Sequence, residues 1–220
     1  LKAVETFDRQ TYPNKELIVV FNGDALPSLQ KLNLNRERND VKFVSVPQEL
    51  FAGACLNCGH VNANGNYYFR VDDDDYYGSN YILDMVLHAR SIDADLFGKP
   101  PAPLSFEDDP ALYGRKVRSP LSIVSPRLLS RGKVWMGGSS IAGHSKFFSK
   151  EHYADFSFGA ADSSLMLNLS PNDKRVFAIM DGLNLVAKRR VDQSTHTWKV
   201  EPDTLKTNCM ETNTIEDMMV

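Results

Sequence analysis

Apolar stretches of strand length alternate with stretches of helical spacing along the first 90 residues. The segment from Glu16 to Phe21 is apolar after its first residue, and the turn residues Asn22-Gly23-Asp24 follow it. The segment from Val41 to Val46 alternates between apolar and polar residues, as a half-buried strand does. These patterns predict two strands before residue 50.

The segment from residue 51 to residue 65 has helical spacing and ends in a helix stop. Its apolar positions recur three or four residues apart, at Phe51, Cys55, Cys58 and Val61. Asn64-Gly65 supplies the residue types that commonly end a helix. The two cysteines face one side of this helix, where we expect small buried residues, with a redox role as the alternative.

A strand rich in aromatic residues comes next, from Asn66 to Val71, and runs directly into four aspartates. The stretch from Asn80 to Ala89 predicts an amphipathic helix, with Ser79 as its N-cap. Strands that alternate with helices in this way predict an α/β fold with a mainly parallel sheet and helices on both faces. Ligands bind such sheets beyond the carboxyl ends of the strands, which is where the aspartates fall.

The four consecutive carboxylates Asp72 to Asp75 carry the clearest chemical information in the chain. Adjacent carboxylates oppose one another's ionisation, because like charges at short range raise the pKa of each group. A divalent cation removes that cost, and Mg²⁺ binds one or two carboxylates together with waters and substrate phosphates. The run therefore indicates a site for a metal ion and a diphosphate, with a solvated acidic turn as the alternative.

Composition fits a soluble enzyme and narrows the class of partner. A chain of 220 residues can bury one full core and is near the size of a single α/β domain. Its net charge of −3 offers no basic footprint for nucleic acid. No apolar run approaches the length of a membrane span, and no signal-peptide pattern opens the sequence. The three cysteines complete no zinc site and fit a reducing, cytoplasmic setting.

The middle of the chain is less regular than its beginning. The stretch Lys99-Pro100-Pro101-Ala102-Pro103 interrupts any regular element. Glu107, Asp108 and Asp109 form a second acidic cluster, for which we expect a solvated loop because no strand pattern leads directly into it. The prolines mark no domain boundary, since the motifs described next continue beyond them.

An ordered set of motifs resembles family 2 glycosyltransferases, the inverting enzymes of GT-A fold. The segment from Gln10 to Val20 is similar to the start of the family's second strand. Asn57, the stretch from Ala63 to Asp72, and Ser79 to Ile82 follow the family's order of helix, Gly turn, strand and DXD motif. The later motifs of the set are Gly137-Gly138-Ser139-Ser140, Asp162 and His196-Thr197-Trp198. The resemblance covers most of the chain.

This resemblance implies one GT-A domain over residues 1–220, built on a Rossmann-like sheet. Residues 1–98 would form the nucleotide-sugar half, and residues 99–220 the acceptor and catalytic half. The implied activity is metal-dependent, inverting transfer of a sugar from a nucleotide-diphospho-sugar, first of all a UDP-sugar, to a glycan acceptor. The acceptor would belong to a cell-envelope polysaccharide, and any membrane association would be peripheral.

Two departures from the family pattern concern the nucleotide pocket. The opening segment Leu1 to Phe7 matches the end of the helix after the family's first strand, so we expect the sequence to lack that strand and one wall of the donor pocket. Phe21 stands where family members often carry an acid that contacts the base. Asn22 or Asp24 would take its place, and Asn57 would complete the nucleotide contacts.

The resemblance also assigns a metal site. Asp74 is the expected metal ligand, and Asp72 or Asp73 would contact the ribose or a metal-bound water. His196 would approach the metal from the opposite side, and an imidazole ligand favours Mn²⁺ over Mg²⁺. A surface histidine beside a packed tryptophan is the alternative for His196, and Asp75 is expected to be structural.

Asp162 matches the family's general base, which deprotonates the acceptor hydroxyl. Ala161 replaces the acid that commonly precedes it, and a helix N-cap is the alternative role for Asp162. A single base opposite the leaving group implies direct displacement with inversion. Gly137 and Gly138 are expected to let the backbone approach the donor sugar or its phosphates, with a plain flexible loop as the alternative.

Other features leave alternatives open. Trp135 could form a sugar-stacking platform or be a core residue. The basic run from Lys188 to Arg190 could contact the diphosphate or an anionic acceptor, with a solvated charged face as the alternative. A nucleotidyltransferase of related fold would also hold a metal and phosphates near strand ends. A non-catalytic metal-binding or glycan-binding domain would keep the acidic strand and lose the base.

Overall fold

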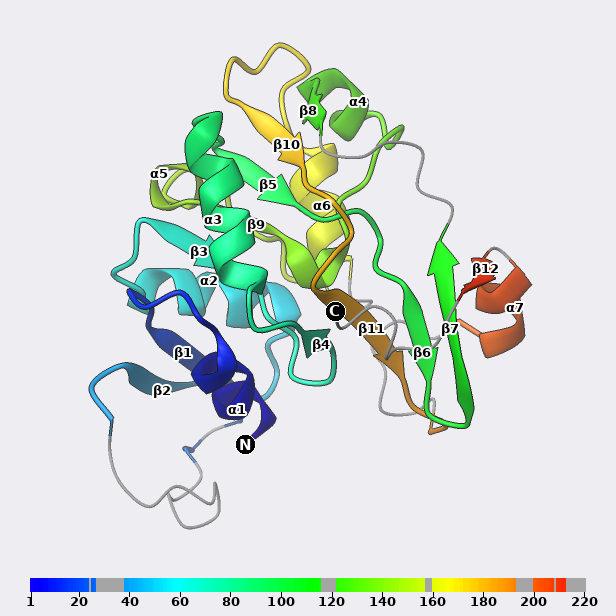
Figure 1. Ribbon diagram of the computed structural model, residues 1–220. Helices are drawn as coiled ribbons and strands as arrows, with labels where there is room; N and C mark the ends of the chain where they lie inside the picture. The colour runs from blue at the N-terminus through cyan, green and yellow to red at the C-terminus, as the bar shows by residue number, and fades with distance from the viewer. Residues whose placement is uncertain are drawn as a thin grey trace.

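The computed structural model describes residues 1–23, 25–26, 38–115, 122–156, 160–192, 200–207 and 209–212. It contains a pair of strands and two five-stranded sheets, with helices packed around them (Figure 1). Asp24 and His196, two of the expected site residues, lie outside the described residues. In the part of the chain that is described, every helix is too short or too polar to cross a membrane.

The first elements are α1 (Lys2–Arg9), β1 (Leu17–Asn22) and β2 (Val41–Val46). The two strands are parallel and pair along their full length, which confirms both strand predictions. Val4 and Phe7 of α1 pack with Val41 against one face of this pair. These apolar positions recur three residues apart in α1, so the helix presents one apolar stripe to the strands.

Five strands form the central sheet, in the order β3-β9-β5-β10-β8. Their bounds are β3 (Tyr67–Phe69), β5 (Leu96–Gly98), β8 (Ser122–Val124), β9 (Ala142–His144) and β10 (Phe177–Ile179). Strands β5 and β10 are parallel, whereas β9 runs antiparallel to both β3 and β5, and β8 runs antiparallel to β10. The sheet is therefore mixed, because β9 inserts between two strands that point the same way.

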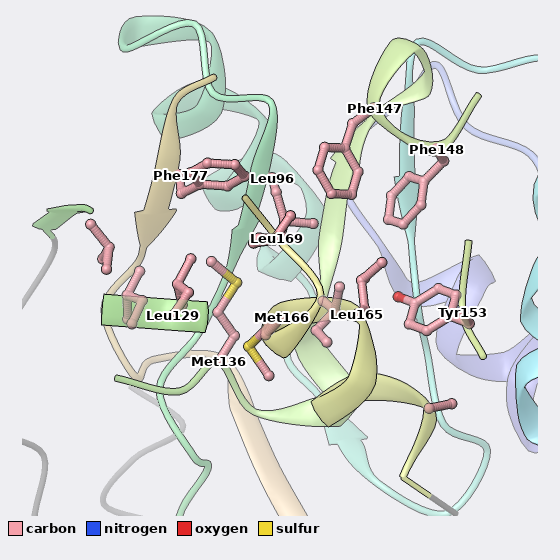
Figure 2. Close-up of a cluster of buried hydrophobic side chains, with 14 residues drawn as sticks. Leu96, Leu129, Met136, Phe147, Phe148, Tyr153, Leu165, Met166, Leu169 and Phe177 are labelled. Atoms are coloured by element: carbon pink, nitrogen blue, oxygen red, sulfur yellow. The ribbon is translucent and has the colours of Figure 1, made fainter. Parts of the chain in front are cut away.

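Helices cover both faces of this sheet, as predicted. They are α2 (Ala52–Asn62), α3 (Tyr81–Ser91), α4 (Pro126–Ser130), α5 (Ser145–Phe148) and α6 (Ala161–Leu167). Leu96 and Phe177 enter a core cluster together with residues of α4, α5 and α6 (Figure 2). Phe97 and Ala178, the next residues along the same strands, enter a second cluster with residues of α3. This alternation is what the two-residue period of a strand dictates when both faces are buried.

A second five-stranded sheet has the order β12-β7-β6-β11-β4. Its elements, with the helix α7 that contacts β12, are β4 (Tyr76–Tyr77), β6 (Leu104–Phe106), β7 (Asp109–Arg115), β11 (Leu185–Arg189), β12 (Cys209–Thr212) and α7 (Pro202–Thr207). Strands β6 and β11 are parallel, and the remaining neighbours in this sheet are antiparallel. Strands β4 and β11 bring this sheet to the residues that follow the carboxylate run.

The prediction of a solvated loop around the second acidic cluster is wrong for Asp109. A strand does lead into the cluster, because Leu104 and Phe106 of β6 are buried against α7. Asp109 is the first residue of β7, and its carboxylate accepts a hydrogen bond from Tyr113 at 2.6 Å and pairs with Lys206. These two partners hold the pKa of Asp109 at about 2.

The start of α3 also differs from the prediction. The N-cap is Asn80 and not Ser79, and the side chain of Asn80 makes no capping hydrogen bond to the helix. Gln10 takes over this role from a distant part of the chain, because its Oε1 accepts from Ile82 N at 3.1 Å. Thr11 Oγ1 donates to Asn80 Oδ1 at 2.8 Å, so the Asn80 side chain faces the α1–β1 connection.

A cavity of about 900 Å³ lies between β1 and β3, among side chains of α1, α2 and α3. Within the described residues β1 pairs with β2 alone and β3 with β9 alone, so each strand has an unpaired edge. His60 and Arg70 are among the lining residues, whereas Asp72 to Asp75 and Asp162 are not. The carboxylates themselves thus lie outside this cavity, although Arg70 and Tyr77, which line it, are bonded to Asp72.

Candidate active site

The carboxylate run leaves the central sheet at the end of β3. Regular pairing stops at Phe69, although Arg70 N still donates to Ile141 O at 3.0 Å. Strand alternation therefore does not extend to the aspartates, and their side chains take separate partners. Asp73 is the exposed member of the run, whereas Asp72, Asp74 and Asp75 are half-buried.

Arg70 forms a two-pronged ion pair with Asp72. Its Nε donates to Asp72 Oδ1 at 2.8 Å and its Nη2 donates to Oδ2 at 3.0 Å. Such a pair is rigid, because the planar guanidinium matches both carboxylate oxygens at once. The sequence prediction missed Arg70. A charged residue in the middle of Tyr67 to Val71 was the available signal, since a buried charge needs a partner.

Tyr77 ties the carboxylate run to the turn at residues 137–140. Its hydroxyl accepts from Asp72 N at 2.9 Å and donates to Ser139 O at 2.8 Å. The Tyr77 side chain is completely buried, and this burial raises its pKa well above the usual value. A neutral phenol at this place can donate and accept at the same time, which keeps two loops from different parts of the sequence together.

Asp74 and Asp75 face the second sheet. Asp75 accepts a hydrogen bond from Lys188 N at 3.0 Å, and Asp74 lies 3.8 Å from the guanidinium of Arg190. Burial, with the nearby charge of Asp72, raises the pKa of Asp75 to about 7. The alternative of a solvated basic face is wrong for Arg189, which is buried. The basic run thus adjoins the carboxylates.

The glycines of the turn have separate contacts. Gly137 N donates to Lys99 O at 2.8 Å, and a Cβ on Gly137 would lie 3.1 Å from Pro100 O. A Cβ on Gly138 would overlap with a carboxylate oxygen of Asp162. Gly138 is therefore required for the position of Asp162. Contact of either glycine with a donor sugar stays a prediction.

Asp162 lies in the first turn of α6, next to Gly138. The N-cap of α6 is Ala160, so the alternative role of Asp162 as an N-cap is wrong. The point where a Gly138 Cβ would stand is 3.5 Å from Arg70 Nη1 and in contact with Asp162 Oδ2. The fold thus brings Asp162 to the guanidinium that holds Asp72, from 90 residues further along the chain.

Tyr153 lies beside these charged groups. The ring is buried in the cluster with Leu165, and its hydroxyl has no hydrogen-bond partner among the described residues (Figure 2). Burial raises the pKa of Tyr153, and the charges of Arg70 and Asp162 act on it in opposite directions. Tyr153 was also missed, because nothing local in the sequence connects it with the carboxylate run.

Two expected nucleotide contacts have protein partners. Both polar atoms of the Asn57 side chain are bonded to the backbone of Tyr153, at 2.8 and 3.0 Å. Asn22 Nδ2 donates to Leu50 O at 2.6 Å and lies 3.8 Å from Cys55 Sγ. Asn22 therefore stands at the carboxyl end of β1 against the start of α2. Both assignments to the nucleotide stay predictions.

Another group of possible metal ligands consists of Asp84, His88 and Asp181. Lys99 lies between the two carboxylates, with its Nζ 3.0 Å from Asp84 Oδ2 and 3.4 Å from Asp181 Oδ1. The Lys99 side chain is completely buried, so these carboxylates balance a buried ammonium ion. The two carboxylates of this group are therefore balanced without a metal ion.

Trp135 precedes the glycine turn and packs its ring against Gly132. A Cβ on Gly132 would lie 3.0 Å from Trp135 Cζ2, and the positive φ of 61° at this glycine favours a residue without a side chain. The Trp135 side chain is 37% exposed. One face of the ring is thus covered by backbone, but the alternative of a core residue is wrong because Trp135 is exposed. A role in sugar stacking stays a prediction.

The family model for glycosyl transferase family 2 matches residues 1–133, which is more than half of the chain. Among solved structures, S. aureus TarS 1–349 is similar with a TM-score of 0.64 and 15% identity, over 85% of this chain and 56% of TarS 1–349. Its complex with UDP-GlcNAc has the same score and identity, over 89% and 56%. A comparison with proteins of curated function gives no match. At this identity the structural likeness shows the fold alone.

Proposed function

This chain belongs to glycosyl transferase family 2, has the GT-A fold and is a glycosyltransferase, and we propose that it transfers a sugar from a UDP-sugar to a glycan hydroxyl with inversion. The proposal is carried by the position of Asp162 beside the carboxylate run. Gly138 contacts Asp162, and Arg70 pairs with Asp72 while its Nη1 faces the same point. The contacts of Gly138 and Arg70 thus support Asp162 as a base that acts next to the carboxylate run.

The choice of UDP-sugar as donor rests on the structural neighbours. TarS 1–349 has been crystallised with UDP-GlcNAc and with UDP. This chain spans 56% of the length of TarS 1–349, so the proposal names the class of donor and not the individual sugar. A cell-envelope glycan as acceptor and a cytoplasmic reaction complete the proposal, and they rest on the family resemblance.

The carboxylate run fits a divalent cation. Asp72 and Asp75 are close enough for the charge of one to raise the pKa of the other, so the cluster holds negative charge in excess. Oxygen donors of this kind suit Mg²⁺ or Mn²⁺. A bound ion would neutralise the diphosphate leaving group and so stabilise the charge that develops there.

Asp74 is the residue we assign as metal ligand. Both oxygens of Asp72 are engaged by Arg70, and Asp75 accepts from the backbone of β11. The ion pair of Asp74 with Arg190 spans 3.8 Å, and the assignment of Asp74 follows the family resemblance. His196 is proposed as the second ligand, and Asp72 and Asp73 as contacts of the ribose or of metal-bound water.

Asp162 is proposed as the general base. It would accept the proton of the acceptor hydroxyl while that oxygen bonds to the anomeric carbon and the bond from that carbon to UDP breaks. The first turn of α6 suits a carboxylate, because the helix dipole favours negative charge there. Since the base acts on the acceptor, its loss lowers turnover and leaves donor affinity nearly unchanged.

The test compares Asp162→Asn with Asp203→Asn, which alters another carboxylate in the first turn of a short helix, α7. UDP release is measured with a panel of UDP-sugars and Mn²⁺, and the anomeric proton of the first-formed product is followed by NMR. We expect turnover to fall by about 10²–10⁴-fold in Asp162→Asn alone, and the product to have the opposite anomeric configuration. Near-normal turnover of Asp162→Asn, retention, or no turnover of any UDP-sugar overturns the proposal.

Metal dependence has its own readout. Thermal unfolding with UDP plus Mn²⁺ should occur at a higher temperature than without them, because a ligand that binds only the folded state stabilises it. Asp74→Ala should abolish this rise, whereas Asp203→Ala should keep it. An equal rise in wild type and Asp74→Ala removes Asp74 from the metal site.

A further inference from the structure

Arg70 is hydrogen-bonded to Asp72, and the charge of Asp162 also acts on its guanidinium. Two of its guanidinium nitrogens, Nε and Nη2, are bonded to Asp72. The third, Nη1, lies 3.5 Å from the point at Gly138 that Asp162 also contacts. The guanidinium is thus bonded to Asp72 through Nε and Nη2, and its Nη1 lies near Gly138, the turn residue that contacts Asp162.

The orientation of Arg70 is set by the sheet and by Asp72. Its backbone N donates to Ile141 O, which continues the pairing of β3 by one residue. Its side chain is 20% exposed. Its two hydrogen bonds to Asp72 fix the orientation of the planar guanidinium. A group held in this way can position a second carboxylate without moving itself.

The surroundings of Asp162 show why a cation is needed here. A Cβ on Gly138 would overlap the Asp162 carboxylate, and the charge of Asp162 acts on the buried hydroxyl of Tyr153. Two carboxylates near the same guanidinium repel each other in a partly buried site, where charges are weakly screened. The positive charge of Arg70, on which both carboxylates act, offsets the repulsion between them.

We propose that Arg70 is a positioning residue that holds Asp72 and Asp162 in a fixed relation, and so aligns the base with the donor half of the site. This inference rests on the proposed role of Asp162 as the base. Arg70 acts through the two acids and contacts no reacting atom. Its removal therefore affects the alignment of the base more than the binding of UDP.

The first test is a double-mutant cycle of Arg70→Met and Asp162→Asn, followed by UDP release from UDP-sugars with Mn²⁺. We expect Arg70→Met to lower turnover at least about 10-fold, while the UDP dissociation constant from calorimetry changes less than about 5-fold. In the Asp162→Asn background, Arg70→Met should cost little further, because residues that act as a unit are not additive. Arg70→Lys should recover only part of the loss, since it keeps the charge and loses the fork.

Arg38 offers a matched control. It forms the same two-pronged pair with the acid two residues further on, with Nε 3.0 Å from Asp40 Oδ1 and Nη2 2.9 Å from Oδ2. This pair lies at the start of β2, where Arg38 also contacts Asp8 of α1. Arg38→Met should therefore leave turnover and UDP affinity unchanged.

Crystal structures of wild type and Arg70→Met supply a readout that needs no turnover. The Asp162 carboxylate should leave its place at Gly138 in Arg70→Met and keep it in Arg38→Met. An unmoved Asp162, normal turnover of Arg70→Met, or full additivity with Asp162→Asn overturns the inference. Failure of the proposed function is distinguishable, because Asp162→Asn by itself would then keep its turnover.

Discussion

The side-chain amide of Asn57 and the backbone of Tyr153 are joined by two hydrogen bonds. Asn57 Nδ2 donates to Tyr153 O at 2.8 Å, and Tyr153 N donates to Asn57 Oδ1 at 3.0 Å. The same segment is fixed again by Asp155, whose carboxylate accepts from Phe51 N and Ala54 N at the start of α2. Asn57 thus fixes α2 to the segment that carries Tyr153, 96 residues away.

Asn57→Ala should lower the free energy of unfolding by about 1–3 kcal/mol, because it leaves a backbone donor and a backbone acceptor without their partners. Urea unfolding measures this loss. Asn62→Ala is the control on the same helix, since the Asn62 amide donates only to Cys58 O and weakly to its sulfur. A loss no larger than that of Asn62→Ala would show that the clamp contributes little.

Gly138→Ala should lower turnover by at least about 10-fold with a nearly unchanged unfolding temperature, because the added methyl group displaces the Asp162 carboxylate and misaligned groups lose catalysis steeply. The measurement is UDP release together with thermal unfolding. Gly182→Ala serves as the control, since the nearest atom to its added methyl is 3.7 Å away, on Pro100. Equal turnover of the two variants would contradict the contact.

Lys99→Met should destabilise the fold by about 3–5 kcal/mol, because it leaves Asp84 and Asp181 without the buried ammonium that pairs with them. Urea unfolding of Lys206→Met gives the comparison. Lys206 pairs with Asp109 and is 29% exposed, so its loss should cost much less than that of Lys99. Similar losses in both variants would mean that burial adds nothing to the Lys99 pair.

His60 makes stability depend on pH. Burial, with the charge of His152, lowers the pKa of His60 to about 4, against 6.5 in the unfolded chain. The unfolded state therefore binds the proton first as the pH falls below 6.5, and stability is lost progressively down to about pH 4. The full shift corresponds to about 3 kcal/mol.

His60→Phe keeps an aromatic ring between Tyr68 and Phe148 and removes this titration. Its free energy of unfolding should fall less than that of wild type between pH 6.5 and 4, as measured by urea unfolding at each pH. Parallel pH curves for the two proteins would show that His60 does not supply the dependence.

Much of the fold is predictable from local patterns. The strands at 17–22 and 41–46 and the helix at 81–91 follow from apolar spacing, because that spacing reports which face of an element is buried. The helix at 52–62 forms where the spacing predicts it, but two of the apolar positions used, Phe51 and Val61, are exposed, and Gly53 is its buried residue. The antiparallel insertion of β9 does not follow, since the sequence of a short apolar strand contains no record of its neighbours. Nor does the capping of α3 by Gln10, which comes from 72 residues away.

In the candidate site, too, some residues are predictable from the sequence and others only from the tertiary structure. By itself the sequence determined the run Asp72 to Asp75 and the isolated Asp162, because charges next to apolar elements mark positions where chemistry outweighs packing. Only the tertiary structure decided that Arg70 takes both oxygens of Asp72 and faces Asp162, and that Gly138 makes room between them. Contacts across 90 residues depend on how β3, the turn at 137–140 and α6 pack together, and packing is a property of the whole core.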